Sequence, residues 1–344
     1  MRTIAFFNNK GGVEKTTLVY HLASMIAEQG ETVLAVDLDP QANLTSMFLS
    51  EDQLEAIWDN GQHQTVHTAL RPIIRGTGDV LSPEPVAVND RLSLIVGDLA
   101  LSTFGDRLSD AWPRCHNGDE AAYRTMSVFH RMIQQAAASL GADWIVVDVG
   151  PNLGAINRAA LLSTDQIVIP LGPDLFSLQG LRNLGPSLRR WRQTWGELYR
   201  KNPDPGLDLP TGRIAPLGYV VMQHGIRDNR PPKAYSKWIE RFPGEYRVSV
   251  LESPPDDSVT SATDPYCLAT LGHYRSLLPM ATEARKPVFA LKPADGAIGA
   301  HGLAVRTSFD EFAALMTRIA NASDDDARAA ARPEHREAQR ALTP

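Results

Sequence analysis

The stretch Lys10-Gly11-Gly12-Val13-Glu14-Lys15-Thr16-Thr17 decides the fold. It follows an apolar run at residues 3–7, typical of a buried parallel strand, and precedes residues 16–29, whose apolar side chains recur with helical spacing. A glycine-rich turn between a strand and a helix directs backbone N–H groups at phosphate. A lysine at its end adds positive charge, and a hydroxyl residue can bind a metal ion. The order of these features predicts a phosphate-binding loop in which Lys15 and Thr16 fill the last two roles.

The loop departs from the usual pattern G-x-x-x-x-G-K-[ST], because Asn9 and Glu14 stand at the two glycine positions. It resembles instead the variant Walker A loop of the ParA/MinD family, K-G-G-x-G-K-[ST], in which a lysine precedes the glycines, as Lys10 does here. The resemblance implies that Lys10 reaches the nucleotide of the partner in a dimer. It also implies ATP and Mg²⁺ as cofactors, with these residues around the phosphates: Gly11, Gly12, Val13, Glu14, Lys15, Thr16 and Thr17.

Two acidic segments farther along the chain extend the resemblance. The run Asp37-Leu38-Asp39-Pro40-Gln41-Ala42-Asn43 is similar to the family's switch I pattern D-x-D-P-Q-x-N. Asp148 ends an apolar run and precedes Gly150-Pro151-Asn152, as the Walker B acid precedes switch II. The resemblance implies that Asp39 orients or activates the attacking water, together with Lys10 and Lys15, and that Thr16, Asp37 and Asp148 bind or surround the metal. It covers roughly residues 1–320 and is weakest over 50–125.

Each of these polar segments follows an apolar strand. Carboxyl ends of parallel strands share one edge of a sheet, where ligands of open α/β folds bind. The sequence therefore predicts an α/β protein with a doubly wound, mostly parallel sheet flanked by helices, of the P-loop NTPase type.

The remaining chain is expected to supply further elements of this fold. Strands are expected at 92–96, 166–171 and 218–222, and helices at 126–140, 177–201, 268–284 and 308–319, the second of them broken near Gly185-Pro186. Residues 50–125 look less regular, with several prolines and glycines. We expect a single domain over residues 1–320 and a flexible polar tail over 321–344, where no apolar face is evident.

Glu14 is the main departure from the family pattern. A side chain forced to positive φ costs roughly 1–2 kcal/mol, and a carboxylate near phosphates adds repulsion on the order of 1–4 kcal/mol. Together these effects predict ATP binding weakened by about two to four orders of magnitude. The alternative is that Glu14 turns outward and pairs with a cation, so that activity is only reduced.

The family resemblance implies an enzyme that hydrolyses ATP with Mg²⁺ as a switch. It implies an ATP-dependent homodimer, DNA binding without sequence preference, a ParB-like activating protein, and a role in partition or positioning of DNA or another cargo. Candidate DNA contacts are Arg189, Arg190 and Arg192, in a basic stretch where Trp191 and Trp195 are interleaved. The competing interpretation of this stretch is an ordinary solvated helix whose tryptophans pack inward.

The composition limits the other classes of function. The net charge of −6 over 344 residues argues against a protein coated in nucleic acid. No window approaches about 18 apolar residues, and two isolated cysteines suit a reducing compartment. We expect no membrane partner and a cytoplasmic location, nucleoid-associated when DNA is bound. A non-hydrolysing regulatory or scaffold protein on the same fold stays open. A MinD-type membrane switch would need a bulky apolar C-terminal helix, and an iron-protein type would need bridging cysteines.

Overall fold

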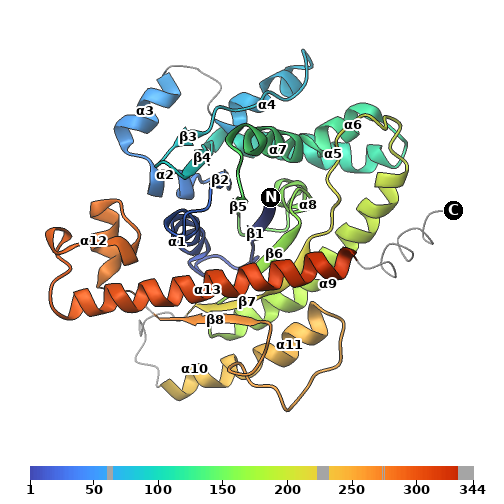
Figure 1. The fold of residues 1–344 in the computed structure, drawn as a ribbon. Helices are drawn as coiled ribbons and strands as arrows, with labels where there is room; N and C mark the ends of the chain where they lie inside the picture. Colours follow the sequence, from blue (N-terminus) through green and yellow to red (C-terminus); the bar gives the residue numbers. More distant parts are fainter. Residues whose placement is uncertain (60–64, 223–231, 273, 275, 332–344) are drawn as a thin grey trace.

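The computed structural model describes residues 1–59, 65–222, 232–272, 274 and 276–331. An eight-stranded sheet runs through the molecule in the order β3-β4-β2-β5-β1-β6-β7-β8 (Figure 1). All neighbouring strands are parallel except β3 and β4. The predicted doubly wound, mostly parallel sheet is confirmed. Its strands are β1 (Arg2–Phe6), β2 (Val33–Leu38), β3 (Val86–Ala87), β4 (Leu92–Ile95), β5 (Trp144–Val149), β6 (Gln166–Leu171), β7 (Ala215–Met222) and β8 (Cys267–Leu271).

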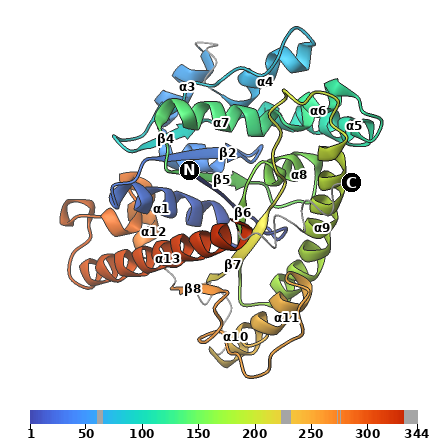
Figure 2. The same cartoon turned by 45° about the vertical axis from the view of Figure 1, so that its right-hand side comes forward.

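Helices cover both faces of the sheet (Figure 2). One face carries α1 (Lys15–Glu28), α2 (Asn43–Phe48), α3 (Glu51–Asp59), α12 (Leu277–Ala284), the short η2 (Val288–Ala290) and η3 (Pro293–Asp295) turns and α13 (Ala300–Ala331). The other carries α4 (Val66–Arg75), η1 (Leu99–Phe104), α5 (Gly105–Cys115), α6 (Glu120–Met126), α7 (Val128–Leu140), α8 (Ala155–Leu162), α9 (Leu175–Arg200), α10 (Pro232–Ile239) and α11 (Phe242–Ser249).

The alternation of side chains along each strand divides the core in two. On β1, Ile4 and Phe6 pack under α1 and α13, whereas Ala5 points into the cluster under α7 and α8. Successive side chains of a strand point to opposite faces, so a strand covered on both sides is apolar throughout. This is why residues 3–7 read as an unbroken apolar run. In β2 and β5, which are buried throughout, packing on both faces fixes which way the side chains at the carboxyl end of the strand point.

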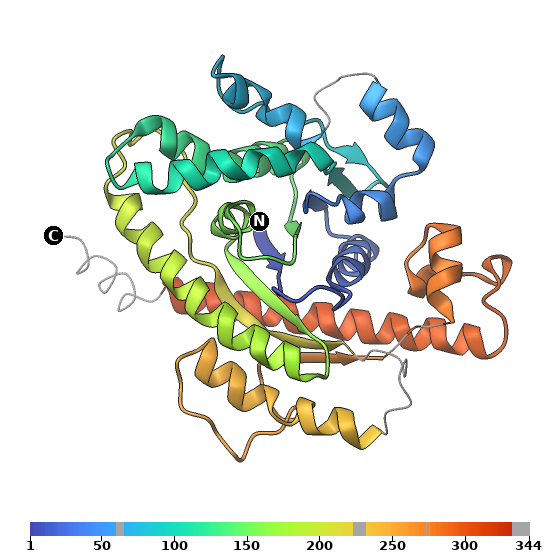
Figure 3. The same cartoon turned by 180° about the vertical axis from the view of Figure 1, so that it is seen from behind.

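The helix expected to break near Gly185 continues without interruption, so that prediction is wrong. α9 runs from Leu175 to Arg200 and is the long yellow-green helix on the near side of the view from behind in Figure 3. Pro186 has no backbone N–H, so α9 lacks one hydrogen bond there. The buried apolar side chains of Leu184, Leu188 and Trp191 pack against the core and stabilise the helix across this position. Gly185 serves close packing instead: a Cβ there would lie 1.8 Å from the carbonyl oxygen of Ser249 in α11.

Two other expectations differ from the structure. The single helix expected over 268–284 is wrong, because residues 267–271 form the edge strand β8 and only α12 is helical. A short apolar run fits either a strand or a helix, and pairing with β7 decides it. Residues 50–125 are more regular than expected: they hold α3 to α6 and two strands, with Pro72 and Pro113 inside helices.

The boundary expected at residue 320 falls inside an element. α13 passes through it to Ala331, and residues beyond 320 contact the sheet. Arg2 pairs with Asp324 at 2.6 Å, and the Gln166 side chain donates to Asp326 at 2.7 Å. These contacts are polar, so a search for an apolar face could not find them. Residues 332–344 of the expected tail lie outside the described residues. Over the part of the chain that the structure describes, no helix is both long and apolar enough to cross a membrane.

The packing of α9 gives a test of the fold. Gly185→Ala should lower the free energy of unfolding by about 1–3 kcal/mol, because the added methyl group collides with the backbone of α11. Gly196→Ala, in the same helix with nothing within 4 Å of its Cβ position, should raise it by about 0.5–1 kcal/mol. Urea unfolding of both variants measures the two changes. Changes of the same sign would contradict the packing described for Gly185.

Candidate functional site

The loop after β1 forms the floor of a cavity of about 310 Å³ at the carboxyl edge of the sheet. Gly12 has φ 73°, a left-handed conformation that glycine adopts without strain. A Cβ on Gly11 or Gly12 would meet nothing within 4 Å, so these glycines shape the backbone and leave the space above them open. The wall of the cavity brings together the predicted loop and both switch segments: Lys10, Gly11, Gly12, Val13, Glu14, Lys15, Thr16, Thr17, Asp39, Gln41, Asn43 and Pro151.

Glu14 adopts the left-handed conformation expected at its position, with φ 55° and ψ 30°. It caps α1, which begins at Lys15, and it lines the cavity. The conformation belongs to the fold of the loop itself, since the chain must turn there to start α1. Its cost of roughly 1–2 kcal/mol therefore falls on folding. Glu14 also lines the cavity, so the charge of its side chain lies beside any phosphate bound there.

Parallel pairing places two carboxylates side by side beneath the loop. Asp37 on β2 is in register with Asp148 on β5, and both side chains are fully buried. The Asp37 carboxylate accepts hydrogen bonds from the backbone N–H groups of Thr45, at 2.8 Å, and Asp39, at 3.2 Å. Burial, and then the neighbouring Asp148, raise the pKa of Asp37 to about 7. The raised pKa of Asp37 reflects the cost of holding two charged carboxylates side by side in a buried position.

The contacts of Asp148 fit a bound cation. Its Oδ2 accepts a hydrogen bond from the Thr16 hydroxyl at 2.7 Å, and its Oδ1 lies 3.7 Å from Lys15 Nζ. That Oδ1 is buried and, among the described residues, has no hydrogen-bond donor. Burial raises the pKa of Asp148 although Lys15 opposes the change. A buried carboxylate oxygen without a donor is costly unless a cation satisfies it.

The donor set matches a hard divalent ion bound partly by phosphate. No group of at least three His, Cys, Asp or Glu side chains that could hold a metal occurs within the described ranges. Two carboxylates and one hydroxyl, Asp37, Asp148 and Thr16, are what the site offers. Mg²⁺ is typically held by one or two carboxylates and substrate phosphates, with water completing its shell. The residues predicted to surround the metal are thus brought together.

Switch I and switch II meet at Asp39. The side chain of Asp39 is buried and accepts a hydrogen bond from the Gln41 backbone at 3.0 Å. A Cβ on Gly150 would lie 3.3 Å from Asp39 Oδ1, so the two segments are in close contact. Asp39 also lines the cavity with the phosphate loop. Asp39 therefore lies where the phosphate loop and both switch segments meet.

Lys10 has a partner that sequence reasoning missed. Its ammonium group forms an ion pair with Asp174, which caps α9 by accepting a hydrogen bond from Ser177 N at 2.9 Å. The Lys10 backbone N–H donates to Asn8 Oδ1 at 2.9 Å. An aspartate just before an amphipathic helix is an N-cap signal that could have located Asp174, although not its contact with Lys10. In this structure the lysine is held by its own chain.

The segment over 286–301, to which the sequence assigned no role, braces the site from behind. The Val288 N–H donates to His21 Nε2 at 3.0 Å, while His21 Nδ1 lies 2.7 Å from the Thr17 carbonyl oxygen. Burial lowers the pKa of His21 to about 4, so the ring is neutral. Arg285 donates to the carbonyl oxygen of Leu49, next to α2. The C-terminal part of the chain thus fixes both the phosphate-loop helix and the helix after switch I.

The basic stretch of α9 divides into different environments. Arg189 pairs with Glu252 at 2.9 Å and donates to the Ser249 carbonyl oxygen, so it is engaged within the chain. Burial and Arg189 lower the pKa of Arg192, whereas Arg190 is exposed. The interleaved tryptophans are buried, and Trp195 donates to the Pro210 carbonyl oxygen at 2.8 Å. The tryptophans thus pack inward, while the expected contact of Arg189, Arg190 and Arg192 with DNA stays a prediction.

Comparison with known proteins agrees with this geometry. The AAA_31 family model, described as an AAA domain, matches residues 1–199. A putative replication protein A from Rhizobium rhizogenes is 33% identical over 170 residues, 47% of this chain but only 37% of that protein. The chromosome partitioning protein ParA from Caulobacter vibrioides is 26% identical over 193 residues, covering 56% of this chain and 64% of ParA. The matched segments thus span less than two thirds of these relatives.

Solved structures share the fold over nearly the whole chain. The protein DIP2308 from Corynebacterium diphtheriae superposes with a TM-score of 0.66 at 24% identity, covering 95% of this chain and 100% of that one. A putative plasmid partition protein from Borrelia burgdorferi, bound to AMPPNP, gives a TM-score of 0.55 at 18% identity, covering 93% and 98%. The chain has the fold of ParA-like P-loop NTPases such as the Borrelia partition protein, and it belongs to the AAA-domain family matched over residues 1–199.

Proposed function

We propose that this chain is a ParA-like switch that binds and hydrolyses ATP with Mg²⁺. The observation that carries the proposal is the convergence of Thr16, Asp37 and Asp148 beneath the phosphate loop, with a buried Asp148 oxygen that has no donor among the described residues. The partition role named for the Caulobacter relative and the AMPPNP bound to the Borrelia protein support the same assignment.

Each group of the site has a chemical task in this proposal. Backbone N–H groups of the loop and Lys15 hold the β- and γ-phosphates, and Thr16 with the two carboxylates holds the metal ion. Mg²⁺, when bound, neutralises charge on the transferred phosphoryl group. Asp39, from switch I, accepts a hydrogen bond from the attacking water and orients it. Positioning and charge neutralisation supply most of the catalysis in phosphoryl transfer.

The proposal includes an ATP-dependent homodimer. In it, Lys10 contacts the nucleotide of the partner subunit, which requires release of the ion pair with Asp174. The dimer then binds DNA without sequence preference and is expected at the nucleoid. A ParB-like protein stimulates hydrolysis, and the cycle partitions or positions DNA or another cargo.

Glu14 supports a second candidate, a non-hydrolysing regulatory or scaffold protein on the same fold. A carboxylate that lines the phosphate cavity opposes a polyanionic ligand. The retention of Lys10, Lys15, Thr16, Asp39 and Asp148 favours the ATPase. ATP binding by the chain and by variants at residue 14 separates the two candidates.

Substitution of Glu14 separates its strain from its charge. Glu14→Gly should raise the free energy of unfolding by about 1 kcal/mol, because glycine adopts the left-handed conformation freely. Glu14→Gln keeps the strain and should leave stability unchanged. Both variants remove the charge and should tighten ATP binding by about fivefold to a thousandfold. Urea unfolding and isothermal titration calorimetry measure the two effects.

Equal ATP affinity in all three proteins would refute a role for the Glu14 charge. Failure of Glu14→Gly to bind ATP at all would favour the scaffold candidate over the ATPase.

The two loop lysines should fail in different ways. In the Glu14→Gly background, Lys15→Ala should weaken ATP binding by roughly 10- to 150-fold, the value of a charge-assisted contact. Lys10→Ala should bind ATP normally but no longer dimerise with it, because Lys10 acts on the partner's nucleotide. Calorimetry and sedimentation velocity with ATP measure these properties. An ATP-dependent dimer of Lys10→Ala would contradict the proposed role.

The acid pair predicts how stability depends on pH. The pKa of Asp37 in the folded chain, about 7, exceeds its ordinary value of 3.8. The folded state therefore binds more protons than the unfolded state between these values, and stability falls as pH rises through this window, by at most about 1.4 kcal/mol per pH unit. Asp37→Asn stays neutral and should lose this part of the slope.

Urea unfolding in metal-free buffer at a series of pH values measures this slope. Asp90→Asn, at an exposed carboxylate, is the matched control and should behave as the unaltered protein does. Added Mg²⁺ should restore stability near neutral pH in the unaltered protein but not in Asp37→Asn. Identical slopes in the unaltered protein and Asp37→Asn would rule out a raised pKa.

A further inference from the structure

Arg158 and Arg190 are a pair of cationic residues outside the nucleotide cavity. Arg158 lies on α8, and Arg190 is exposed on α9, the helix that packs against α8. The Arg158 guanidinium lies against Trp112, which itself stacks on Trp195 of α9. Burial, and then the charge of Arg190, lower the pKa of Arg158 to about 10. Neither arginine lines the cavity beside the phosphate loop.

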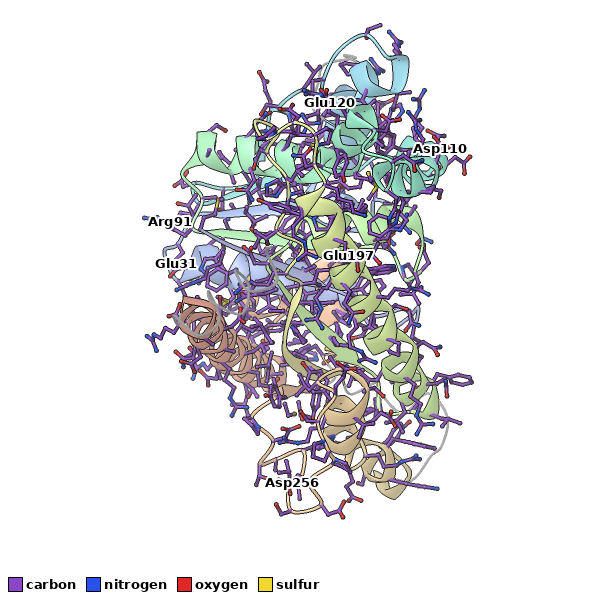
Figure 4. The ribbon with its side chains drawn as sticks, turned by 90° about the vertical axis from the view of Figure 1, so that its right-hand side faces the viewer. Glu31, Arg91, Asp110, Glu120, Glu197 and Asp256 are labelled. Carbon is purple, nitrogen blue, oxygen red and sulfur yellow. The ribbon has the colours of Figure 1, made fainter. Side chains whose placement is uncertain are left out.

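This pair lacks the carboxylate partners that other arginines of the region have. Arg182 pairs with Glu245, Arg189 with Glu252 and Arg114 with Asp119. No ion pair within the described ranges involves Arg158 or Arg190, and the buried Arg158 Nε has no hydrogen-bond acceptor there. Three acidic residues of this region are labelled in Figure 4: Glu197 on α9, and Asp110 and Glu120 on α5 and α6. None of the ion pairs among the described residues joins them to Arg158 or Arg190. A partly buried, unpaired guanidinium beside a second one is costly unless an anion joins them.

An aromatic stack holds the Arg158 side chain in place. Its guanidinium lies 4.2 Å from the centroid of Trp112, and the Trp112 ring stacks on Trp195 with centroids 6.1 Å apart and an interplanar angle of 17°. Trp112 therefore contacts both Trp195 and Arg158, and these two neighbours occupy ring surface that a nucleobase would need. The group thus offers cations to phosphate but no platform for a base.

The pair is connected to the nucleotide site through α8. Asn157, next to Arg158, is buried and donates to the carbonyl oxygens of Gly150, at 2.7 Å, and Asn152, at 2.6 Å, in switch II. Gly150 in turn contacts Asp39 of switch I. A change in switch II conformation therefore acts directly on the first turn of the helix that carries Arg158.

We propose that Arg158 contacts the phosphate backbone of DNA together with Arg190, and that Arg190 does so without Arg189 and Arg192, the other two arginines expected from the sequence. This inference rests on the DNA binding included in the proposed function. Guanidinium groups suit phosphate because their planar N–H donors match its oxygens. A contact between guanidinium groups and phosphate does not depend on base sequence, and the link through Asn157 makes it respond to the nucleotide.

The adjacent residues of α9 provide a matched test. Arg190→Gln and Arg189→Gln each remove one positive charge from the same helix, but Arg189 is paired with Glu252 and Arg190 is not. Binding to a labelled duplex of random sequence is measured by fluorescence anisotropy with saturating Mg-ATP over a series of salt concentrations. Arg190→Gln and Arg158→Gln should each reduce the slope of log K against log salt by about 0.9 for every phosphate that the variant no longer neutralises.

Arg189→Gln should leave that slope unchanged, and ATP affinity should be unchanged in all three variants. Thermal unfolding shows whether Arg158→Gln, which can no longer stack its guanidinium on Trp112, remains folded. Arg190→Gln, at an exposed position, keeps the inference testable if it does not. A second titration replaces DNA with inorganic polyphosphate to distinguish the nucleic acid from a free anion.

The outcomes separate the inference from the proposed function. A reduced slope in Arg190→Gln but not in Arg189→Gln supports the inference. DNA binding by the unaltered protein with an unchanged slope in Arg190→Gln overturns the inference alone, as does a slope that falls only in Arg189→Gln. Arginine-dependent binding of polyphosphate without binding of DNA assigns the site to a free anion and overturns it too. No DNA binding by the unaltered protein, despite ATP hydrolysis, removes the DNA-binding part of the proposed function together with the inference.

Discussion

The parallel register between β2 and β5 governs how the site is assembled. It sets Asp37 beside Asp148 in a buried position, where two carboxylates repel each other and neither is hydrated. The fold tolerates this because Thr16 and Lys15 approach Asp148 from the phosphate loop and backbone N–H groups of switch I approach Asp37. The same register thus assembles loop, switch I and strand end into one site. The remaining imbalance of charge is what suits the site to a divalent cation.

The contacts around this site differ in how firmly they hold their residues. His21 and Arg285 tie the phosphate-loop helix and the end of α2 to the C-terminal part of the chain. Lys10 is instead held by a partly exposed ion pair with Asp174, a type of contact that contributes little to stability and is readily exchanged. A rigid floor with an exchangeable lysine at its rim is consistent with a switch. Glu14 adopts a strained left-handed conformation where the loop joins α1, and it lines the same cavity as Lys10.

Whether an arginine of this protein is available to a ligand depends on whether a carboxylate of the same chain already pairs with it. From the sequence, Arg189, Arg190 and Arg192 look equivalent, yet one is neutralised by Glu252, one is exposed and one is half-buried. Arg158 carries no distinctive signal in the sequence, because it is an isolated arginine in an apolar helix. Its position over Trp112 beside Arg190 comes from the packing of α5, α8 and α9. Long-range contacts therefore decide which cations remain available to a ligand.

The sequence by itself determined the features that depend on residues close together in the chain. Alternating burial on both faces made the central strands continuous apolar runs, and the loop over Lys10–Thr17 with Asp37, Asp39 and Asp148 located the site at their ends. Only the tertiary structure decided the features that depend on distant partners. Pairing with β7 made residues 267–271 a strand, burial against the core and α11 kept α9 whole at Gly185, and Asp174 came to lie against Lys10. Local propensity is weak at each of these positions, so contacts formed across the sheet and between helices determine the outcome.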